Sequence, residues 1–173
     1  MKQFSKQAQH LNKTIALASQ NSSTTETEEL LVRFSIFQLD CALSLSVLNE
    51  CKPVGFARKQ VLAKLAHCLY EFDDTFNHHM KRVILKVADE KESMLTGKNL
   101  KLIKKKYPGI NNITKFHDIR NKLSAHYDKN FSTLFSSAEE LTETEVLVAH
   151  DDSAKFYKEI IEVLIGNKSP PST

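Results

Sequence analysis

The stretch FHDIRNKLSAHYD, residues 116–128, has the apolar spacing of an amphipathic helix but carries an arginine within the apolar stripe. At about 100° per residue, five apolar residues fall on one face of roughly 120°: Ile113, Phe116, Ile119, Leu123 and Tyr127. Arg120 lies within that face and His126 lies at its edge. Burying an unpaired arginine is very costly, so Arg120 requires an anionic partner or a functional role.

Arg120 and His126 are residue types that can cleave an RNA phosphodiester. Histidine has an ordinary pKa of about 6.5, so it exchanges a proton with a ribose 2′-hydroxyl or a leaving oxygen at neutral pH. The planar guanidinium of arginine binds two phosphate oxygens and stabilises the charge of a pentavalent phosphorane. RNA supplies its own nucleophile, so this chemistry requires neither a metal nor a cofactor. The structural alternative pairs Arg120 with Asp118, Asp128 or a more distant carboxylate.

The pattern Arg120-Asn121, followed by His126, resembles the signature of the HEPN superfamily. The segments Arg120–Lys122 and Ala125–Asp128 are most similar to its abortive-infection branch. The resemblance implies an all-α bundle of four or five helices, usually a homodimer. For many members it implies a metal-independent ribonuclease of toxin–antitoxin or phage-defence systems. On this resemblance Arg120 and His126 are catalytic, and Asn121 is the polar residue that supports them.

Length and composition predict a single all-α domain. The chain has 173 residues, of which 41% are apolar and 26% charged, as in ordinary globular proteins. Its 4 glycines and 4 prolines cluster between periodic segments, and no segment alternates in the manner of a β-strand. Together with the resemblance, this pattern predicts a HEPN-like up-and-down helical bundle with an extra N-terminal helix.

Three regions are expected along the chain. Residues 1–25 form an amphipathic helix over 3–19 and a flexible linker, residues 26–167 form the HEPN-like helical domain, and residues 168–173 form a disordered tail. Within the domain, apolar spacing and capping residues predict helices over 28–50, 56–95 (with a kink near Asp73), 98–106, 111–127 and 151–165. Residues 130–149 have the weakest pattern, and 145–149 are consistent with an extended segment.

The apolar segment Leu30–Leu48 has the length of a membrane span, but its composition favours a core helix. Asp40 would lie near the middle of the bilayer, where a carboxylate costs about 2.5–3.5 kcal/mol even on a lenient scale. Residues 1–19 carry Lys6, His10 and Lys13 and lack the continuous apolar core of a signal peptide. We therefore expect a cytoplasmic protein without membrane contact.

Neither the cysteines nor the histidines predict a metal or cofactor site. The cysteines are odd in number, have no metal-like spacing and indicate reduced thiols in a cytosolic protein; they are Cys41, Cys51 and Cys68. Asp74 and His78 share a helix face next to Asp73 and His79, but two ligands do not make a metal site.

Positive charge is concentrated around the motif. Residues 98–129 carry nine Lys or Arg against two Asp, a net charge of +7, whereas the whole chain carries +3. A basic zone suits a polyanionic substrate, and we expect Lys104, Lys105, Lys106 and Lys122 to bind RNA. The alternative is a solvated, lysine-rich helix next to a turn.

Helical geometry predicts a homodimer. Six residues on a helix separate Arg120 and His126 by about 9 Å along the axis and about 120° around it, which is too far apart to hold one phosphate. A two-fold axis that brings two motif helices together would form one cleft with two Arg–His pairs, in agreement with the shared cleft of HEPN ribonucleases. We expect this interface to include the motif helix and the Leu30–Leu48 helix.

Three hypotheses for function follow from these patterns. The leading one is a dimeric, cytosolic HEPN-type endoribonuclease, a toxin or phage-defence effector that an antitoxin or other regulatory protein restrains. The second is a non-catalytic HEPN-like module that binds RNA or a protein partner. The third is a helical scaffold in which Arg120 forms a structural ion pair.

Overall fold

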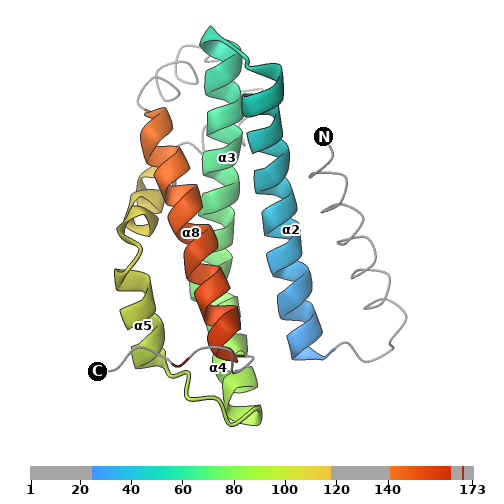
Figure 1. The fold of residues 1–173 in the computed structure, drawn as a ribbon, viewed down its shortest axis with the longest axis vertical. Coiled ribbons are helices and arrows are strands. Elements are labelled where there is room, and N and C mark those ends of the chain that lie inside the picture. Colours follow the sequence, from blue (N-terminus) through green and yellow to red (C-terminus); the bar gives the residue numbers. More distant parts are fainter. Residues whose placement is uncertain (1–24, 118–140, 165–168, 170–173) are drawn as a thin grey trace.

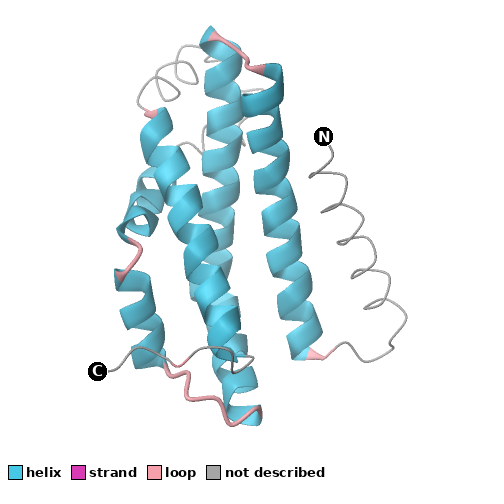
Figure 2. Cartoon of the chain, viewed as in Figure 1, coloured by secondary structure: helices cyan, strands magenta, loops and turns pink. Residues whose placement is uncertain are grey.

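The computed structural model describes residues 25–117, 141–164 and 169, and every regular element among them is a helix (Figure 2). In chain order the elements are α2 (Glu26–Ser46), η1 (Val47–Cys51), α3 (Gly55–Thr75), η2 (Phe76–Met80), α4 (Lys81–Glu90), α5 (Gly97–Lys105), η3 (Pro108–Phe116) and α8 (Glu143–Leu164). The predicted all-α class is confirmed for these residues. The predicted helix over 3–19 and nearly all of the predicted tail lie outside them.

The described elements run alternately up and down (Figure 1). The helix α2 runs antiparallel to the continuous rod formed by α3, η2 and α4. The next two elements, α5 and η3, run back along the outside of α8, and α8 itself runs parallel to α3. The core lies between α2, α3 and α8.

Aromatic rings fill the centre of this core around Tyr157 of α8. The ring centroid of Tyr157 lies 5.2 Å from that of Phe34, 4.6 Å from that of Phe72 and 5.5 Å from that of Phe76. Phe37 of α2 stacks on Phe72 of α3 at 4.0 Å. Each such pair contributes roughly 0.5–1.5 kcal/mol beyond the burial of its area, so this cluster holds the three long helices together.

Local chemistry defines both ends of the continuous helix formed by α2 and η1. At the start, the Thr25 hydroxyl accepts a hydrogen bond from the Glu28 amide at 3.3 Å, and the Glu28 carboxylate accepts one from the Thr25 amide at 2.9 Å. This reciprocal capping box stabilises the first turn. At the other end, Lys52 adopts a left-handed conformation with φ of 45° and precedes Pro53. The predicted helix over 28–50 is confirmed.

One described helix, Glu28–Cys51, is long and apolar enough to cross a membrane by length and composition alone. One of its faces lies in the protein core, where Leu30, Phe34, Cys41 and Leu48 are buried. A buried face of this kind is typical of the core helix of a globular domain.

The predicted helix over 56–95 is largely confirmed as α3, η2 and α4, with a π-helical segment at Phe76–Met80 close to the expected kink. It ends at Glu90 and not at residue 95. A turn stops it there, because Glu92 adopts a φ of 52° and the Ser93 amide donates to the Ala88 carbonyl at 2.7 Å. The following Met94 is 72% exposed, whereas Met80 is completely buried.

The predicted start of the helix over 111–127, for which we expected Asn111 or Asn112 as the cap, is wrong. A 3₁₀ helix, η3, begins at Pro108 and continues to Phe116. Its buried residues Ile110, Ile113 and Phe116 recur at every third position, which is the period that brings side chains onto one face of a 3₁₀ helix. Residues 118–127 of the predicted motif helix lie outside the described residues.

The final helix begins earlier than predicted, and the interpretation of 145–149 as extended is wrong. It starts at Glu143, where the Thr142 hydroxyl accepts a hydrogen bond from the Glu145 amide at 3.3 Å. Val146 and Ala149 are fully buried and continue the apolar stripe that leads to Phe156. Burial on this stripe overrides the low helix propensity of the valine.

Gly109 allows η3 and α8 to approach closely. Its amide donates to Asp152 Oδ2 at 2.7 Å. A Cβ atom at residue 109 would lie 2.7 Å from that oxygen and 2.8 Å from Cγ1 of Val148. Such contacts are too short, so any side chain at this position would separate the two elements.

We predict that Gly109→Ala lowers the free energy of unfolding by about 1–3 kcal/mol, because overpacking a close contact displaces backbone and side chains. Urea denaturation, monitored by circular dichroism, measures this free energy. The matched control is Gly97→Ala, where the nearest atom to the new Cβ is 3.9 Å away. Equal effects of the two substitutions would contradict the close-packing interpretation.

Candidate functional site

The residues predicted to be catalytic, Arg120, Asn121 and His126, lie outside the described residues, as does Lys122. The structure describes the chain up to His117, three residues before Arg120. The ring of His117 lies 5.5 Å from that of Tyr70 in α3, and Phe116 before it is fully buried. The segment that leads into the motif is therefore anchored on α3 and on the core.

Lys104, the first of the predicted RNA-binding lysines, faces a buried acid. Its ammonium group lies 3.3 Å from Asp73 Oδ1 of α3, and Asp73 also accepts a hydrogen bond from the Asn77 side-chain amide at 2.9 Å. The Asp73 side chain is 12% exposed, so Lys104 compensates a carboxylate that has lost most of its water.

Lys106 has a more deeply buried partner. Its ammonium group lies 2.6 Å from Glu159 Oε1 of α8, and the Tyr107 hydroxyl donates to Glu159 Oε2 at 2.6 Å. The Glu159 side chain is only 3% exposed. Burial and the hydrogen bond to Glu159 raise the pKa of Tyr107 to about 12, so this phenol remains a donor at neutral pH. Lys106 and Tyr107 together hold the end of α5 on α8.

The outward face of α5 carries a different set of lysines. Lys98, Lys101 and Lys105 are exposed, whereas Asn99, Leu100 and Ile103 are buried. The spacing of three and then four residues places the three lysines on one face of the helix. No carboxylate of the described part of the chain pairs with any of them. We call this set the lysine stripe.

The lysine stripe shares only Lys105 with the run that the sequence analysis selected. Adjacent lysines on a helix point in directions about 100° apart, so a run of three cannot face one ligand together. The signal that identifies Lys98 and Lys101 is their helical spacing with Lys105, which the sequence analysis did not use. RNA binding by either set of lysines stays a prediction.

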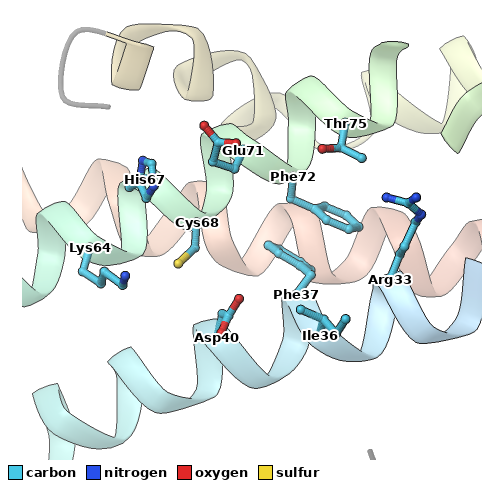
Figure 3. Close-up of a pocket in the computed structure, with 10 residues that line it drawn as sticks. All are labelled: Arg33, Ile36, Phe37, Asp40, Lys64, His67, Cys68, Glu71, Phe72 and Thr75. Carbon is cyan, nitrogen blue, oxygen red and sulfur yellow. The ribbon is translucent and has the colours of Figure 1, made fainter. Parts of the chain in front are cut away.

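A cleft of about 330 Å³ lies between α2 and α3 (Figure 3). Apolar side chains form part of it, among them the stacked rings of Phe37 and Phe72. Charged and polar side chains of both signs surround them: Arg33, Asp40, Lys64, His67 and Glu71. A cleft with this lining suits a small polar ligand better than a polyanion, because its acidic groups repel phosphate.

Cys68 is the one thiol that lines this cleft, and it is poorly suited to nucleophilic chemistry. Burial raises the pKa of Cys68, and the neighbouring Asp40 raises it further. The reactive form of cysteine is the thiolate, so a thiol of raised pKa stays protonated and unreactive at neutral pH.

The histidines next to Asp73 and Asp74 face different acids. His78 Nε2 lies 3.4 Å from Asp74 on the same helix, whereas His79 Nε2 lies 3.6 Å from Glu29 of α2. Within residues 25–117 and 141–164, no group of three His, Cys, Asp or Glu is arranged to hold a metal ion. The lysine stripe is a row of exposed cations, and exposed cations attract anions.

No protein-family model, no curated protein and no solved structure matches this chain at a significant level.

We predict that Lys106→Met destabilises the fold, because it leaves the buried carboxylate of Glu159 without its cation. The expected loss is about 1–3 kcal/mol in the free energy of unfolding, the usual cost of an under-compensated buried polar group. Lys105→Met is the matched control and should change the stability by less than about 0.5 kcal/mol. Urea unfolding of both variants measures the difference, and comparable stabilities would show that the Lys106–Glu159 pair contributes little.

Proposed function

We propose that this chain is a metal-independent endoribonuclease of the HEPN type, in which Arg120 and His126 are catalytic and Asn121 supports them. The observation that carries the proposal is the Arg120-Asn121…His126 motif within a segment of net charge +7. Two features of the described residues support it. Phe116, four residues before Arg120, is buried in the core, and the lysine stripe of α5 offers a binding surface for phosphates.

The proposed reaction is transesterification within the RNA. A histidine removes the proton of the ribose 2′-hydroxyl, and the oxygen attacks the adjacent phosphorus. The bond from phosphorus to the 5′-oxygen breaks, and that oxygen takes up a proton. Arg120 stabilises the charge of the phosphorane between these steps. The products are a 2′,3′-cyclic phosphate and a 5′-hydroxyl.

We propose further that the active form is a homodimer with both motif helices at one cleft. The support is geometric, since Arg120 and His126 of one straight helix cannot reach the same phosphate. One chain has a mass of 19.7 kDa. A dimer should therefore scatter light as a particle of twice that mass, whereas the mass of a single chain would contradict the shared cleft. The proposed setting is a cytoplasmic toxin or phage-defence effector that a regulatory protein restrains.

We predict that Arg120→Ala and His126→Ala each reduce RNA cleavage by about 10²–10⁴-fold, the range typical of one general acid–base group. Asn121→Ala should have a smaller effect, because an amide positions groups but transfers no proton at neutral pH. Labelled RNA incubated in the presence of a chelator, with analysis of the product ends, measures the rates.

RNA with a 2′-deoxy sugar at the scissile position is the substrate control and should resist cleavage. Circular dichroism and light scattering should show that the variants are folded and retain the assembly of the wild type. Cleavage by the double variant Arg120→Ala/His126→Ala at the wild-type rate would overturn the catalytic assignment, as would its unfolding. Binding of RNA by the wild type without any cleavage would instead support a non-catalytic module.

We predict that replacing all three lysines of the stripe, Lys98, Lys101 and Lys105, by glutamine lowers the affinity for RNA. The affinity of this triple variant should also depend less on the salt concentration. Each lost phosphate contact reduces the slope of log K against log salt by about 0.7 for single strands, so the triple variant should lose about 2 in slope. The comparison variant is Lys104→Gln, whose ammonium group faces Asp73. Fluorescence anisotropy at several salt concentrations measures both, and an unchanged slope in the triple variant would mean that the stripe is only a solvated face.

A further inference from the structure

The cleft between α2 and α3 offers an apolar surface to a ligand. Its volume of about 330 Å³ lies at the lower end of the range of small-molecule sites. The rings of Phe37 and Phe72, stacked at 4.0 Å, lie between the two helices (Figure 3). Ile36 lines the cleft next to them and is 43% exposed. A ligand with an apolar part would cover this surface, and the burial of apolar area favours binding.

Hydrogen-bond donors occupy one end of this cleft. The side chains of Arg33 from α2 and of Thr75 from α3 lie there (Figure 3). The Arg33 guanidinium donates from Nε and Nη2 to Glu29 Oε1 at 2.9 Å and 2.7 Å, which holds it in place. No oxygen of the described residues accepts a hydrogen bond from its Nη1 group. Guanidinium groups form strong, charge-assisted hydrogen bonds with carboxylates, so this end suits a ligand carboxylate.

An acidic group lies about two helical turns away from these donors. Asp40 follows Arg33 by seven residues, so that both lie on the same face of α2, about 10 Å apart along its axis. The Asp40 side chain points across the cleft toward α3 (Figure 3). It forms no ion pair with a cation of the described part of the chain. A carboxylate without a cation suits a ligand ammonium group.

The opposite wall adds one more charge of each sign. Because α3 runs antiparallel to α2 and Phe72 stacks on Phe37, Glu71 lies within about one turn of the level of Asp40. Lys64 lies at the end of the cleft far from Arg33 (Figure 3). Two acids and two bases leave the lining, apart from a histidine, without net charge. A ligand of one sign would therefore meet like charges, whereas a zwitterion has a partner for each of its groups.

We propose that this cleft binds a small zwitterion, with its carboxylate at Arg33, its ammonium group at Asp40 and an apolar chain over Phe37 and Phe72. The side chains lean toward the ligand from both ends, so its two charges should be about 6–10 Å apart. Dipeptides and ω-amino acids have this separation, whereas the charges of an α-amino acid are too close together. The site is independent of the proposed ribonuclease activity, because it includes no residue of the Arg120 motif.

The first test compares ligands that differ by one charge or in length. In a nuclear magnetic resonance titration of the full chain, we expect 6-aminohexanoate to bind with a dissociation constant of about 1 mM, a usual affinity for so few atoms. Hexanoate and hexylamine each lack one charged group and should bind at least tenfold more weakly. The short zwitterion 3-aminopropanoate should also bind at least tenfold more weakly. Absence of binding by 6-aminohexanoate, or equal binding of hexanoate or hexylamine, would overturn the proposal.

The second test assigns each ligand group to its partner. In Arg33→Gln the carboxylate has lost its partner, so 6-aminohexanoate should bind no better than hexylamine. In Asp40→Asn the ammonium group has lost its partner, so 6-aminohexanoate should bind no better than hexanoate. The matched controls are Arg82→Gln and Asp89→Asn, at exposed positions of α4 outside the cleft, which should keep the wild-type affinities. Circular dichroism checks that the variants are folded. Wild-type preferences in Arg33→Gln and Asp40→Asn would overturn the assignment.

Discussion

The buried carboxylate of Glu159 is the interaction on which the arrangement around α5 depends. It accepts hydrogen bonds from Lys106 and from Tyr107, so that α5 is held against α8 by one deeply buried acid. Two residues earlier on α8, Tyr157 projects to the opposite side and forms the centre of the aromatic core. One turn of α8 thus contacts the apolar core on one side and α5 on the other. The hydrogen bonds to Glu159 fix the rotation of α5 about its axis.

The acidic side chains of α8 also organise the positive charge of the molecule. Glu143 pairs with Arg58, Glu145 with Lys115 at 3.0 Å, and Asp152 with the Gly109 amide. Together with Glu159 these acids engage basic or amide groups of α3, α5 and η3. The net charge of +7 counted along the sequence is therefore not all available to a ligand. The positive charge that faces solvent on α5 is that of the lysine stripe, because the rotation of α5 about its axis directs Lys104 and Lys106 toward buried acids.

Periodicity and capping residues were sufficient to predict the helix over 28–50 and most of the helix over 56–95. The capping residue Thr25, the pair Lys52-Pro53 after the helix and the apolar stripe of α3 are all local features, and local features are visible in a sequence. The predicted helix boundaries are wrong where tertiary contacts determine the local structure. The start of α8 is stabilised by the burial of Val146, and η3 is shaped by the close approach of Gly109 to Asp152. The residues that form these contacts are far apart in the sequence, so no local pattern predicts the contacts. The assignment of the motif residues as catalytic comes from the sequence alone. The division of the lysines into paired and exposed sets required the structure.

The contrast between Met80 and Met94 gives this fold a built-in chemical reporter. Met94 follows the turn that ends α4 and is largely open to solvent, whereas Met80 is completely enclosed at the end of η2. Peroxide converts an accessible thioether to a polar sulfoxide, and it reaches an enclosed thioether only when the surrounding structure opens. Oxidation of Met94 therefore proceeds in the native state, while oxidation of Met80 requires the helices around it to separate. The ratio of the two rates reports how often the bundle opens, without any label.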